Sequence, residues 1–330
     1  MRGPMGHRMG AVVSLVLFNS ARPLGRCENV TAVWDACDMA KRFERIGYGD
    51  LSRHSDCSVV VTDEFVRGKS ANQSAVMIAH GLTGGKLYGN DQRQGQFTRD
   101  TCSLVDWYVV SSEAGIQLAA SAAGIPESRC LPLGMPRTDA YFGMSRGDGG
   151  TFLAKFGRAY LYAPTFRARY DPPRGRIDWA VLDELMDDDE ILVVKRHPIV
   201  SRPMVGQRLV HIVEADPREP STPYLVDCSV LATDFSSILF DGYVLGKPSV
   251  LTADETDGYL ASRGMYWRYP GQYGSRSVSV EGNERQFLEL LRDAADNGMG
   301  HVELACRERT AGACDGYSTN RVLDLVRGLL

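Results

Sequence analysis

The 330-residue sequence has little excess charge of either sign and no long apolar run. Its 37 Lys and Arg residues against 41 Asp and Glu residues give a formal net charge of −4. Such a balance gives no sign of the basic surface that binds nucleic acids. No stretch reaches the roughly 18 apolar residues of a membrane-spanning helix. We therefore expect no nucleic-acid partner and no spanning segment.

Cysteine is present but lacks the spacing of a metal site. None of the eight residues forms a Cys-x-x-Cys pair or lies near a histidine at zinc-ligand spacing. Scattered cysteines in a chain of this size are typical of buried thiols in a reducing cytosol. We therefore expect a cytoplasmic protein without a structural metal or cofactor. The eight residues are Cys27, Cys37, Cys57, Cys102, Cys130, Cys228, Cys306 and Cys314.

The amino terminus carries a weak feature of a signal peptide. The segment "MRGPMGHRMGAVVSLVLFNSARP" has a basic start followed by a short apolar stretch. Its core "AVVSLVLF" also has the composition of a buried first strand, and we favour that interpretation. Met1, Met5 and Met9 are alternative first residues.

Short apolar runs alternate with longer helical patterns along the chain. This alternation is typical of βαβ units, in which helices cover both faces of a parallel sheet. The expected strands are "VVSLVLF", "CSVVVT", "AVMIA", "WYVVS", "YLYAP", "EILVVK", "VLAT" and "PSVLT". The expected helices include residues 34–47, 113–125, 179–187 and 236–246. The sequence therefore predicts an α/β fold.

A Gly-rich segment near mid-chain predicts a break between two domains. The segment "MSRGDGGTF", residues 144–152, is the least apolar part of the middle of the chain. It leaves halves of about 150 and 180 residues, each large enough for its own doubly wound sheet. The end of the chain is predicted to form an amphipathic helix with an apolar stripe. That stripe is Val322, Leu323, Leu325 and Val326.

Polar side chains follow three of the expected strands. In open α/β sheets, ligands bind beyond the carboxyl ends of the strands, so these side chains are candidates for a site. The first strand is followed by His80 and Gly81, and the second ends in Lys195-Arg196-His197-Pro198. The third is followed by Thr233, Asp234, Ser236 and Ser237.

Each of these groups also has a purely structural interpretation. A lone histidine such as His80 is often hydrogen-bonded in a turn, although a neutral imidazole can also take a proton from a hydroxyl. The basic "KRHP" segment fits either a solvated strand end or a pyrophosphate site. Ser236 and Ser237 can cap a helix, which is compatible with phosphate binding at the helix start.

Two further candidates are weaker. The acidic run "DDDE" at residues 187–190 lies between an expected helix and an expected strand, and we predict a solvated turn instead of a metal site. Arg167 follows the expected strand in "YLYAPTFRARY". It is either an ordinary loop arginine or a phosphate clamp at the edge of a cleft.

Seven motifs follow one another along the chain. In chain order they are "HGLTGGK", "LPLGMPRTDAYF", "YLYAPTFR", "VVKRHP", "LATDFSSILFDGYVLGKPSV", "DETDGYLASRGMYW" and "DGYSTNR". Together they resemble the CDP-glycerol glycerophosphotransferase family of teichoic acid primases and polymerases, and residues 225–264 are the most specific part of the resemblance. The resemblance implies a GT-B fold, in which two Rossmann-like domains face each other across a cleft.

The resemblance also implies a division of labour between the domains. Residues 1–147 would form the acceptor-side domain, 148–316 the domain that binds the CDP donor, and 317–330 a helix packing back on the first domain. The donor would be CDP-glycerol or a related CDP-polyol. The acceptor would be a polymer or a lipid-linked primer, which implies peripheral contact with the inner face of the cell membrane.

Residue roles follow from the same resemblance. His80 matches the histidine proposed as the base on the acceptor hydroxyl. Asp241 follows the serine motif at the family's spacing. The residues expected at the donor phosphates are His197, Ser236 and Ser237, with Thr233, Asp234 and Lys195 in the same motifs and Arg167 in "PTFR".

The sequence departs from the family's pattern at two positions near these residues. Ala79 stands where the family often has Trp, and Phe235 stands where it usually has Tyr. Two alternatives therefore stay open at this stage. One is a nucleotide-sugar glycosyltransferase or epimerase of the same fold, and the other is a non-catalytic member that binds nucleotide or polymer.

Overall fold

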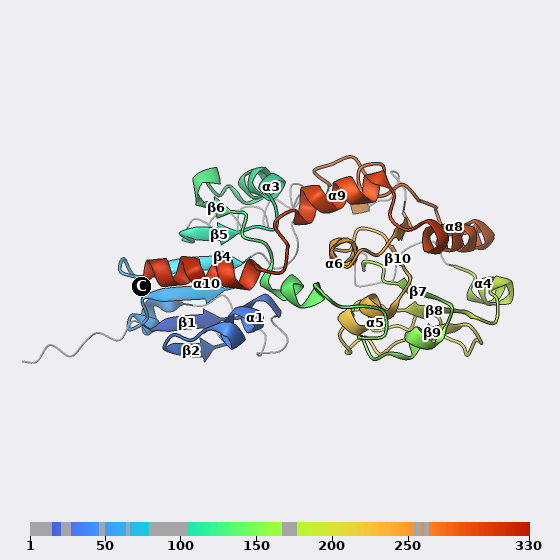
Figure 1. The fold of residues 1–330 in the computed structure, drawn as a ribbon, viewed down its shortest axis with the longest axis horizontal. Helices are drawn as coiled ribbons and strands as arrows, with labels where there is room; N and C mark the ends of the chain where they lie inside the picture. The colour runs from blue at the N-terminus through green and yellow to red at the C-terminus, as the bar shows by residue number, and fades with distance from the viewer. Residues whose placement is uncertain are drawn as a thin grey trace, which may run out of the picture.

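A computed structural model of the chain shows two lobes, each built on a parallel β-sheet (Figure 1). The N-terminal lobe has six strands in the order β2-β1-β3-β4-β5-β6, and the C-terminal lobe has five in the order β11-β10-β7-β8-β9. The two lobes confirm the predicted GT-B-like α/β architecture. The structure describes residues 15–20, 28–45, 50–63, 67–78, 104–166, 177–253, 259–260 and 264–330.

The strands fall on the predicted apolar runs, with three short additions. In the N-terminal lobe they are β1 (Val16–Asn19), β2 (Lys41–Glu44), β3 (Val59–Thr62), β4 (Ser74–Ile78), β5 (Trp107–Val109) and β6 (Cys130–Leu131). In the C-terminal lobe they are β7 (Arg158–Tyr162), β8 (Glu190–Val194), β9 (Ile212–Glu214), β10 (Val230–Thr233) and β11 (Ser249–Leu251). The additions β2, β6 and β9 were not predicted.

The described helices connect these strands and cover both faces of the sheets. The α-helices are α1 (Glu28–Ala36), α3 (Glu113–Ala123), α4 (Trp179–Leu185), α5 (Thr222–Asp227), α6 (Ile238–Val244), α8 (Glu284–Asn297), α9 (His301–Ala311) and α10 (Ser318–Leu329). The 3-10 helices are η1 (Leu51–His54), η2 (Glu127–Arg129), η3 (Pro136–Tyr141) and η4 (Phe152–Lys155).

Strand β7 illustrates how the C-terminal sheet is buried from both sides. Ala159 and Leu161 pack in one apolar cluster together with side chains of α5 and α6. Tyr160 and Tyr162 point to the other face, into a cluster with side chains of α4 and α8. Because both faces are covered, the strand is apolar throughout instead of alternating with polar residues.

The helix predicted at residues 34–47 is wrong beyond Ala36. Helix α1 ends there, and Lys41–Glu44 form β2, which pairs in parallel with β1. The ammonium of Lys41 donates to the carbonyl oxygens of Trp34 (2.5 Å) and Cys37 (2.8 Å). A cation on these last carbonyls terminates the helix, so the chain is released to form an edge strand.

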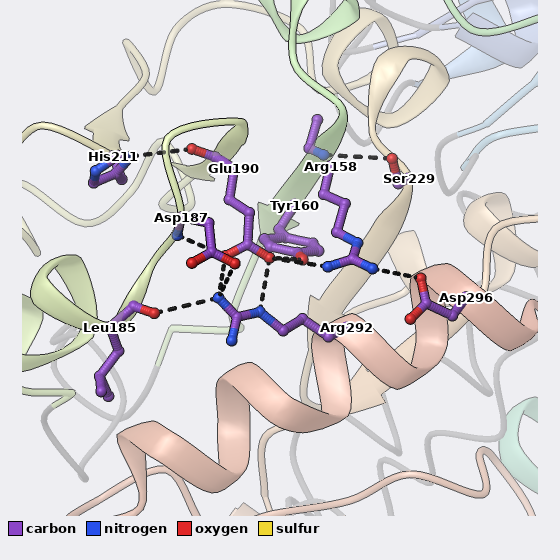
Figure 2. A network of polar contacts seen from close by, with 10 residues as sticks. Arg158, Tyr160, Leu185, Asp187, Glu190, His211, Ser229, Arg292 and Asp296 are labelled. Atoms are coloured by element: carbon purple, nitrogen blue, oxygen red, sulfur yellow. Dashed lines mark hydrogen bonds and ion pairs between the residues drawn. The ribbon is translucent and has the colours of Figure 1, made fainter.

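The acidic run at residues 187–190 is only partly a solvated turn. Asp187 to Asp189 are exposed, but Glu190 is the first residue of β8 and is fully buried. Its carboxylate accepts hydrogen bonds from Tyr160 and Arg292 (Figure 2). The prediction is therefore corrected for Glu190, whose buried carboxylate is stabilised by an arginine on α8.

The Gly-rich segment predicted as a break is tied to the C-terminal lobe by Asp227. The buried carboxylate of this residue accepts from the backbone N–H groups of Gly147 (2.8 Å), Gly149 (3.0 Å) and Thr151 (2.7 Å), and from the Thr151 hydroxyl (2.7 Å). A Cβ on Gly149 would lie 2.2 Å from the carbonyl oxygen of Pro223. Glycine is therefore needed where the segment approaches the lobe this closely.

The terminal helix α10 returns from the C-terminal lobe and packs on the N-terminal lobe against α1 and η3 (Figure 1). Val322, Leu323 and Val326 of the predicted stripe are buried, while Leu325 is half-buried. The carboxylate of Asp139 in η3 accepts from the backbone N–H groups of Ser318 (3.0 Å) and Thr319 (2.6 Å). Asp139 thereby satisfies the first free donors of the helix.

The six cysteines that lie in the described residues are all free and buried, as predicted. Burial raises the pKa of Cys130 and Cys306 to about 11, so these thiols are inert at neutral pH. Cys27 and Cys102 lie outside the described residues. Within the described part of the chain, none of the helices combines the length and the apolar character needed to cross a bilayer.

Candidate functional site

A cavity of about 280 Å³ lies between the lobes, at the carboxyl ends of strands from both sheets. Strand order reverses between β1 and β3 in one lobe and between β10 and β7 in the other. Such switch points are where open α/β sheets bind ligands. Asn29 and Asp63 line the cavity beyond β1 and β3, and Ala163 and Ser236 line it beyond β7 and β10.

Residues after three strands of the C-terminal lobe form one wall of the cavity. Ala163 and Pro164 follow β7 directly, and Ser236 and Ser237 lie between β10 and α6. The basic segment after β8 completes this wall with Lys195, Arg196, His197 and Pro198. The structure thus brings together two of the three groups that the sequence singled out.

The ring of His197 is exposed and has a defined orientation. The backbone N–H of Ile199 donates to Nδ1 of His197 (3.2 Å), and the Phe166 ring lies 4.8 Å from the imidazole, centroid to centroid. Because Nδ1 is an acceptor here, a neutral imidazole carries its proton on Nε2. The ring can therefore donate a hydrogen bond to an oxygen atom of a ligand.

The two serines differ from the helix caps that the sequence also allowed. Ser237 occupies the N-cap position of α6, but within the described residues its side chain makes no capping hydrogen bond. Ser236 is half-buried and Ser237 is exposed, and both line the cavity. Both residues therefore lie at the cavity, where a serine hydroxyl can donate a hydrogen bond to a ligand.

Thr233 and Asp234 lie behind this wall and do not line the cavity. The Thr233 hydroxyl donates to the carbonyl oxygen of Ala163 (2.7 Å), and the Asp234 carboxylate accepts from the backbone N–H of Thr165 (2.8 Å). Both side chains are buried. They hold the loop after β7 against the end of β10, which positions the wall.

Lys195 and Arg196 are held by neighbouring groups. The Lys195 ammonium is buried and donates to the carbonyl oxygen of Asp216 (2.7 Å), and burial lowers its pKa. The Arg196 guanidinium pairs with Glu214 at 2.7 Å and also donates to the carbonyl oxygen of Val200. These contacts fix the course of the loop that carries His197.

The N-terminal lobe supplies the opposite wall, which sequence reasoning missed. This wall consists of Glu28, Asn29, Asp63, Arg137 and Tyr141. Of these residues, Arg137 and Tyr141 lie in a quoted motif, "LPLGMPRTDAYF", which was the available signal. The Arg137 guanidinium pairs with Asp241 of α6 at 2.9 Å, so the two walls are in direct contact.

Two predicted site residues, His80 and Arg167, lie outside the described residues. Strand β4, which leads to His80, ends at Ile78, and the described chain after β7 extends to Phe166. Among the residues that the structure does describe, no cluster of three His, Cys, Asp or Glu side chains has metal-binding geometry.

Comparison with known proteins places this geometry in a family. The profile of the family described as CDP-Glycerol:Poly(glycerophosphate) glycerophosphotransferase matches residues 51–328. A solved structure of the wall teichoic acid polymerase TagF superposes with a TM-score of 0.74 at 16% identity, covering 96% of this chain and 89% of that one. At that identity the likeness shows the shared fold.

Two curated relatives match a large part of the chain. The teichoic acid ribitol-phosphate polymerase TarL of Staphylococcus aureus is 28% identical over 238 residues, which is 67% of this chain and 40% of the relative. The teichoic acid ribitol-phosphate primase of Bacillus spizizenii is 24% identical over 251 residues, 69% of this chain and 60% of the relative. The matched region is therefore only part of each relative's length. Because the family profile covers most of the sequence, the chain belongs to the CDP-Glycerol:Poly(glycerophosphate) glycerophosphotransferase family.

Proposed function

We propose that the protein transfers a polyol phosphate, glycerol phosphate in the first instance, from a CDP-polyol to a hydroxyl group of a teichoic-acid-like or capsular polymer or its lipid-linked primer. The family match over residues 51–328 carries this proposal. It favours a CDP-polyol donor over the UDP-sugar donor of a glycosyltransferase or epimerase. The cavity supports it, because imidazole and hydroxyl donors there suit phosphate oxygens.

The proposed reaction is a displacement at phosphorus. The acceptor oxygen forms a bond to the phosphorus that bears the polyol, and the bond from that phosphorus to the bridging oxygen breaks. CMP leaves with the electron pair, and His80 accepts the proton of the attacking hydroxyl. Such a transfer depends on positioning and charge stabilisation more than on covalent chemistry by the protein.

We assign the donor phosphates to His197, Ser236 and Ser237. The positions of all three residues in the cavity wall and the orientation of the His197 ring support this assignment. Arg167 is assigned to the same phosphates through its motif alone. Thr233, Asp234 and Lys195 then act indirectly, because their side chains are occupied in holding the loops of the wall.

The domain limits belong to the same proposal. We place the acceptor-side domain at residues 1–147, the donor domain at 148–316 and the returning helix at 317–330. The last strand of the first sheet ends at Leu131 and the first strand of the second begins at Arg158, which is compatible with this division. A lipid-linked acceptor would bring the protein to the inner face of the cell membrane as a peripheral partner.

The test is nucleotide release by the purified protein. CDP-glycerol, CDP-ribitol and a panel of UDP-sugars are offered with and without a lipid-linked acceptor analogue. We expect CMP only from a CDP-polyol, with the polyol identified by the faster reaction. UDP release from a sugar donor, or no release from any donor with the acceptor present, would contradict the proposal.

The role of His80 is tested separately. His80→Ala should abolish turnover and leave the affinity for the CDP-polyol unchanged. His211→Ala is the matched control, because His211 contacts the Glu190 carbonyl at the far side of the sheet (Figure 2). Equal turnover of the His80 variant and the wild type would show that His80 is not the base.

A further inference from the structure

One ion pair joins the two walls of the cavity. Arg137 lies in η3 of the N-terminal lobe and Asp241 in α6 of the C-terminal lobe, 104 residues apart. Nη2 of the guanidinium donates to Oδ1 (2.9 Å) and Oδ2 (3.0 Å) of the carboxylate, and Nε donates to Oδ1 (3.3 Å). The side chains are only 10% and 12% exposed.

Arg137 is anchored on its own lobe as well. Its backbone N–H donates to Oδ1 of Asn29 (3.1 Å), and its Nε lies 3.7 Å from the Glu28 carboxylate. Burial disfavours the charge of the guanidinium, but Asp241 more than offsets this effect, so the pKa of Arg137 is raised. The pair therefore stays ionised and is held firmly on the N-terminal side.

The geometry of the pair fixes orientation in addition to distance. A guanidinium that shares both oxygens of a carboxylate constrains the angle between the two groups, whereas a single ammonium contact allows rotation. Both residues line the cavity, so the constraint acts where the walls meet. Small displacements there change the distance between groups on opposite walls.

The segment that carries Arg137 is also tied on its other side. Asp139 accepts the first N–H groups of α10, and Nε of Arg321 donates to the carbonyl oxygen of Leu133 (2.9 Å). A Cβ on Gly134 would lie 2.3 Å from the hydroxyl oxygen of Ser318. These contacts hold η3 against α10, so Arg137 projects from a fixed support.

We propose that Arg137 and Asp241 are positioning residues whose ion pair sets the spacing and orientation of the two walls. The pair holds the cavity wall of the N-terminal lobe opposite the wall of the C-terminal lobe to which we assign the donor phosphates. This inference rests on the proposed function for its catalytic consequence. Its structural consequence, a fixed relation between the lobes, is independent of any activity.

The test compares two double variants. Arg137→Met with Asp241→Leu removes the pair without leaving a buried charge, which protects folding. Asp38→Leu with Arg327→Met removes an exposed Arg–Asp pair within the N-terminal lobe and serves as the control. Each protein is examined by small-angle X-ray scattering, by calorimetric titration with CMP and by turnover of CDP-glycerol.

We expect the first variant to broaden the distribution of interatomic distances and to lower kcat by about 100-fold, the usual cost of misplaced reacting groups. Its affinity for CMP should be unchanged, because the fold of the C-terminal lobe, to which we assign the nucleotide, is kept. The control should match the wild type throughout. Arg137→Lys should remain impaired, because it restores the charge without the paired bonds.

Two outcomes would overturn the proposal. A loss of CMP affinity that parallels the loss of kcat would make Arg137 a ligand contact. Unchanged scattering in the first variant would show that the pair does not set the lobe arrangement. If the wild type transfers nothing, the proposed function fails, while the scattering comparison still decides the role of the pair.

Discussion

The five-stranded sheet has an amino edge, where its strands begin, and a carboxyl edge, where they end. The two edges use polar side chains in opposite ways. At the amino edge, the buried Glu190 and the half-buried Arg292 form a network in which each charged group has partners (Figure 2). At the carboxyl edge, His197, Ser236 and Ser237 surround an open cavity. Polar groups that satisfy one another away from the cavity stabilise the fold, and polar groups that line the cavity are available to a ligand.

The amino edge is complete because each oxygen of Glu190 is occupied. Oε1 accepts from Tyr160 Oη (2.7 Å) and Arg292 Nε (2.9 Å), and Oε2 accepts from Arg292 Nη2 (2.6 Å) and the backbone N–H of Asp187 (3.0 Å). Arg292 lies on α8, so the network attaches that helix to the sheet. Its contribution is to stability, and a ligand would gain nothing there.

The largest effect is expected from a substitution that disrupts the polar network at the amino edge. Arg292→Leu leaves the buried Glu190 carboxylate with Arg158, 3.8 Å away, as its remaining cation, and we expect the free energy of unfolding to fall by about 3 kcal/mol. Urea denaturation measures the change, and CMP affinity should be unaffected. Adding Glu190→Leu should recover much of the loss. A stable single variant would mean that the two edges do not differ in this way.

The next largest effect is expected from removing hydroxyl groups at the carboxyl edge. Ser236→Ala with Ser237→Ala removes two donors to a charged ligand, and we expect the affinity for CDP-glycerol to fall about 10- to 100-fold. The unfolding midpoint should hardly move, because in the described part of the chain the Ser237 side chain makes no capping hydrogen bond. Calorimetric titration gives the affinity, with the exposed Ser279→Ala as control. Retained affinity in the folded double variant would remove the serines from the site.

Replacing His197 should give a smaller change at the same edge. His197→Ala removes one hydrogen-bond donor to phosphate, so we expect donor affinity to fall about tenfold. His211→Ala, at the amino edge, should leave donor affinity intact. An equal loss of donor affinity in the two variants would contradict the contrast between the edges, because it would show a general disturbance of the lobe.

The smallest expected effect is a loss of stability in acid that comes from Glu190 at the amino edge. Burial raises the pKa of Glu190, but the bonds from Arg292, Asp187 and Tyr160 more than offset it, and the net pKa lies below the ordinary value of 4.5. A lowered folded-state pKa gives stability that is present above the unfolded-state value and lost as pH falls through the folded-state value. Comparison with Glu190→Gln isolates this contribution.

Below pH 4.5 the wild type should therefore lose stability faster than Glu190→Gln, with a difference in slope of at most about 1.4 kcal/mol per pH unit. Urea midpoints at a series of pH values give the two slopes. Parallel slopes would show that Glu190 keeps the same proton affinity in the folded and unfolded chain, against the network described above.

Much of the fold could be predicted because the strands are short and apolar on both faces. The runs "CSVVVT" and "EILVVK" leave no helical alternative, and both form strands. The helix prediction for residues 34–47 was wrong beyond Ala36 because the pattern of the segment fits a helix as well as it fits the observed strand. The contact that ends helix α1, from Lys41 to two carbonyl oxygens, depends on how the chain turns back and is not visible in local periodicity.

The candidate site was predictable only on the side that follows the strands directly. Ser236 and His197 lie within a few residues of β10 and β8, so strand prediction located them. Arg137 lies in a 3-10 helix, and its partner Asp241 is 104 residues away. Glu190 was misassigned for a similar reason, since Arg292 is 102 residues distant. Such pairings are set by the tertiary arrangement of both lobes.

The way the lobes are joined has a consequence for how they can move. The first connection is held where Asp227 binds Gly147 and Gly149, and the second where Asp139 binds the start of α10. Each connection is thus fastened to one lobe close to the point where the chain crosses to the other. A displacement of one lobe relative to the other must then be taken up by the few residues on either side of these anchors.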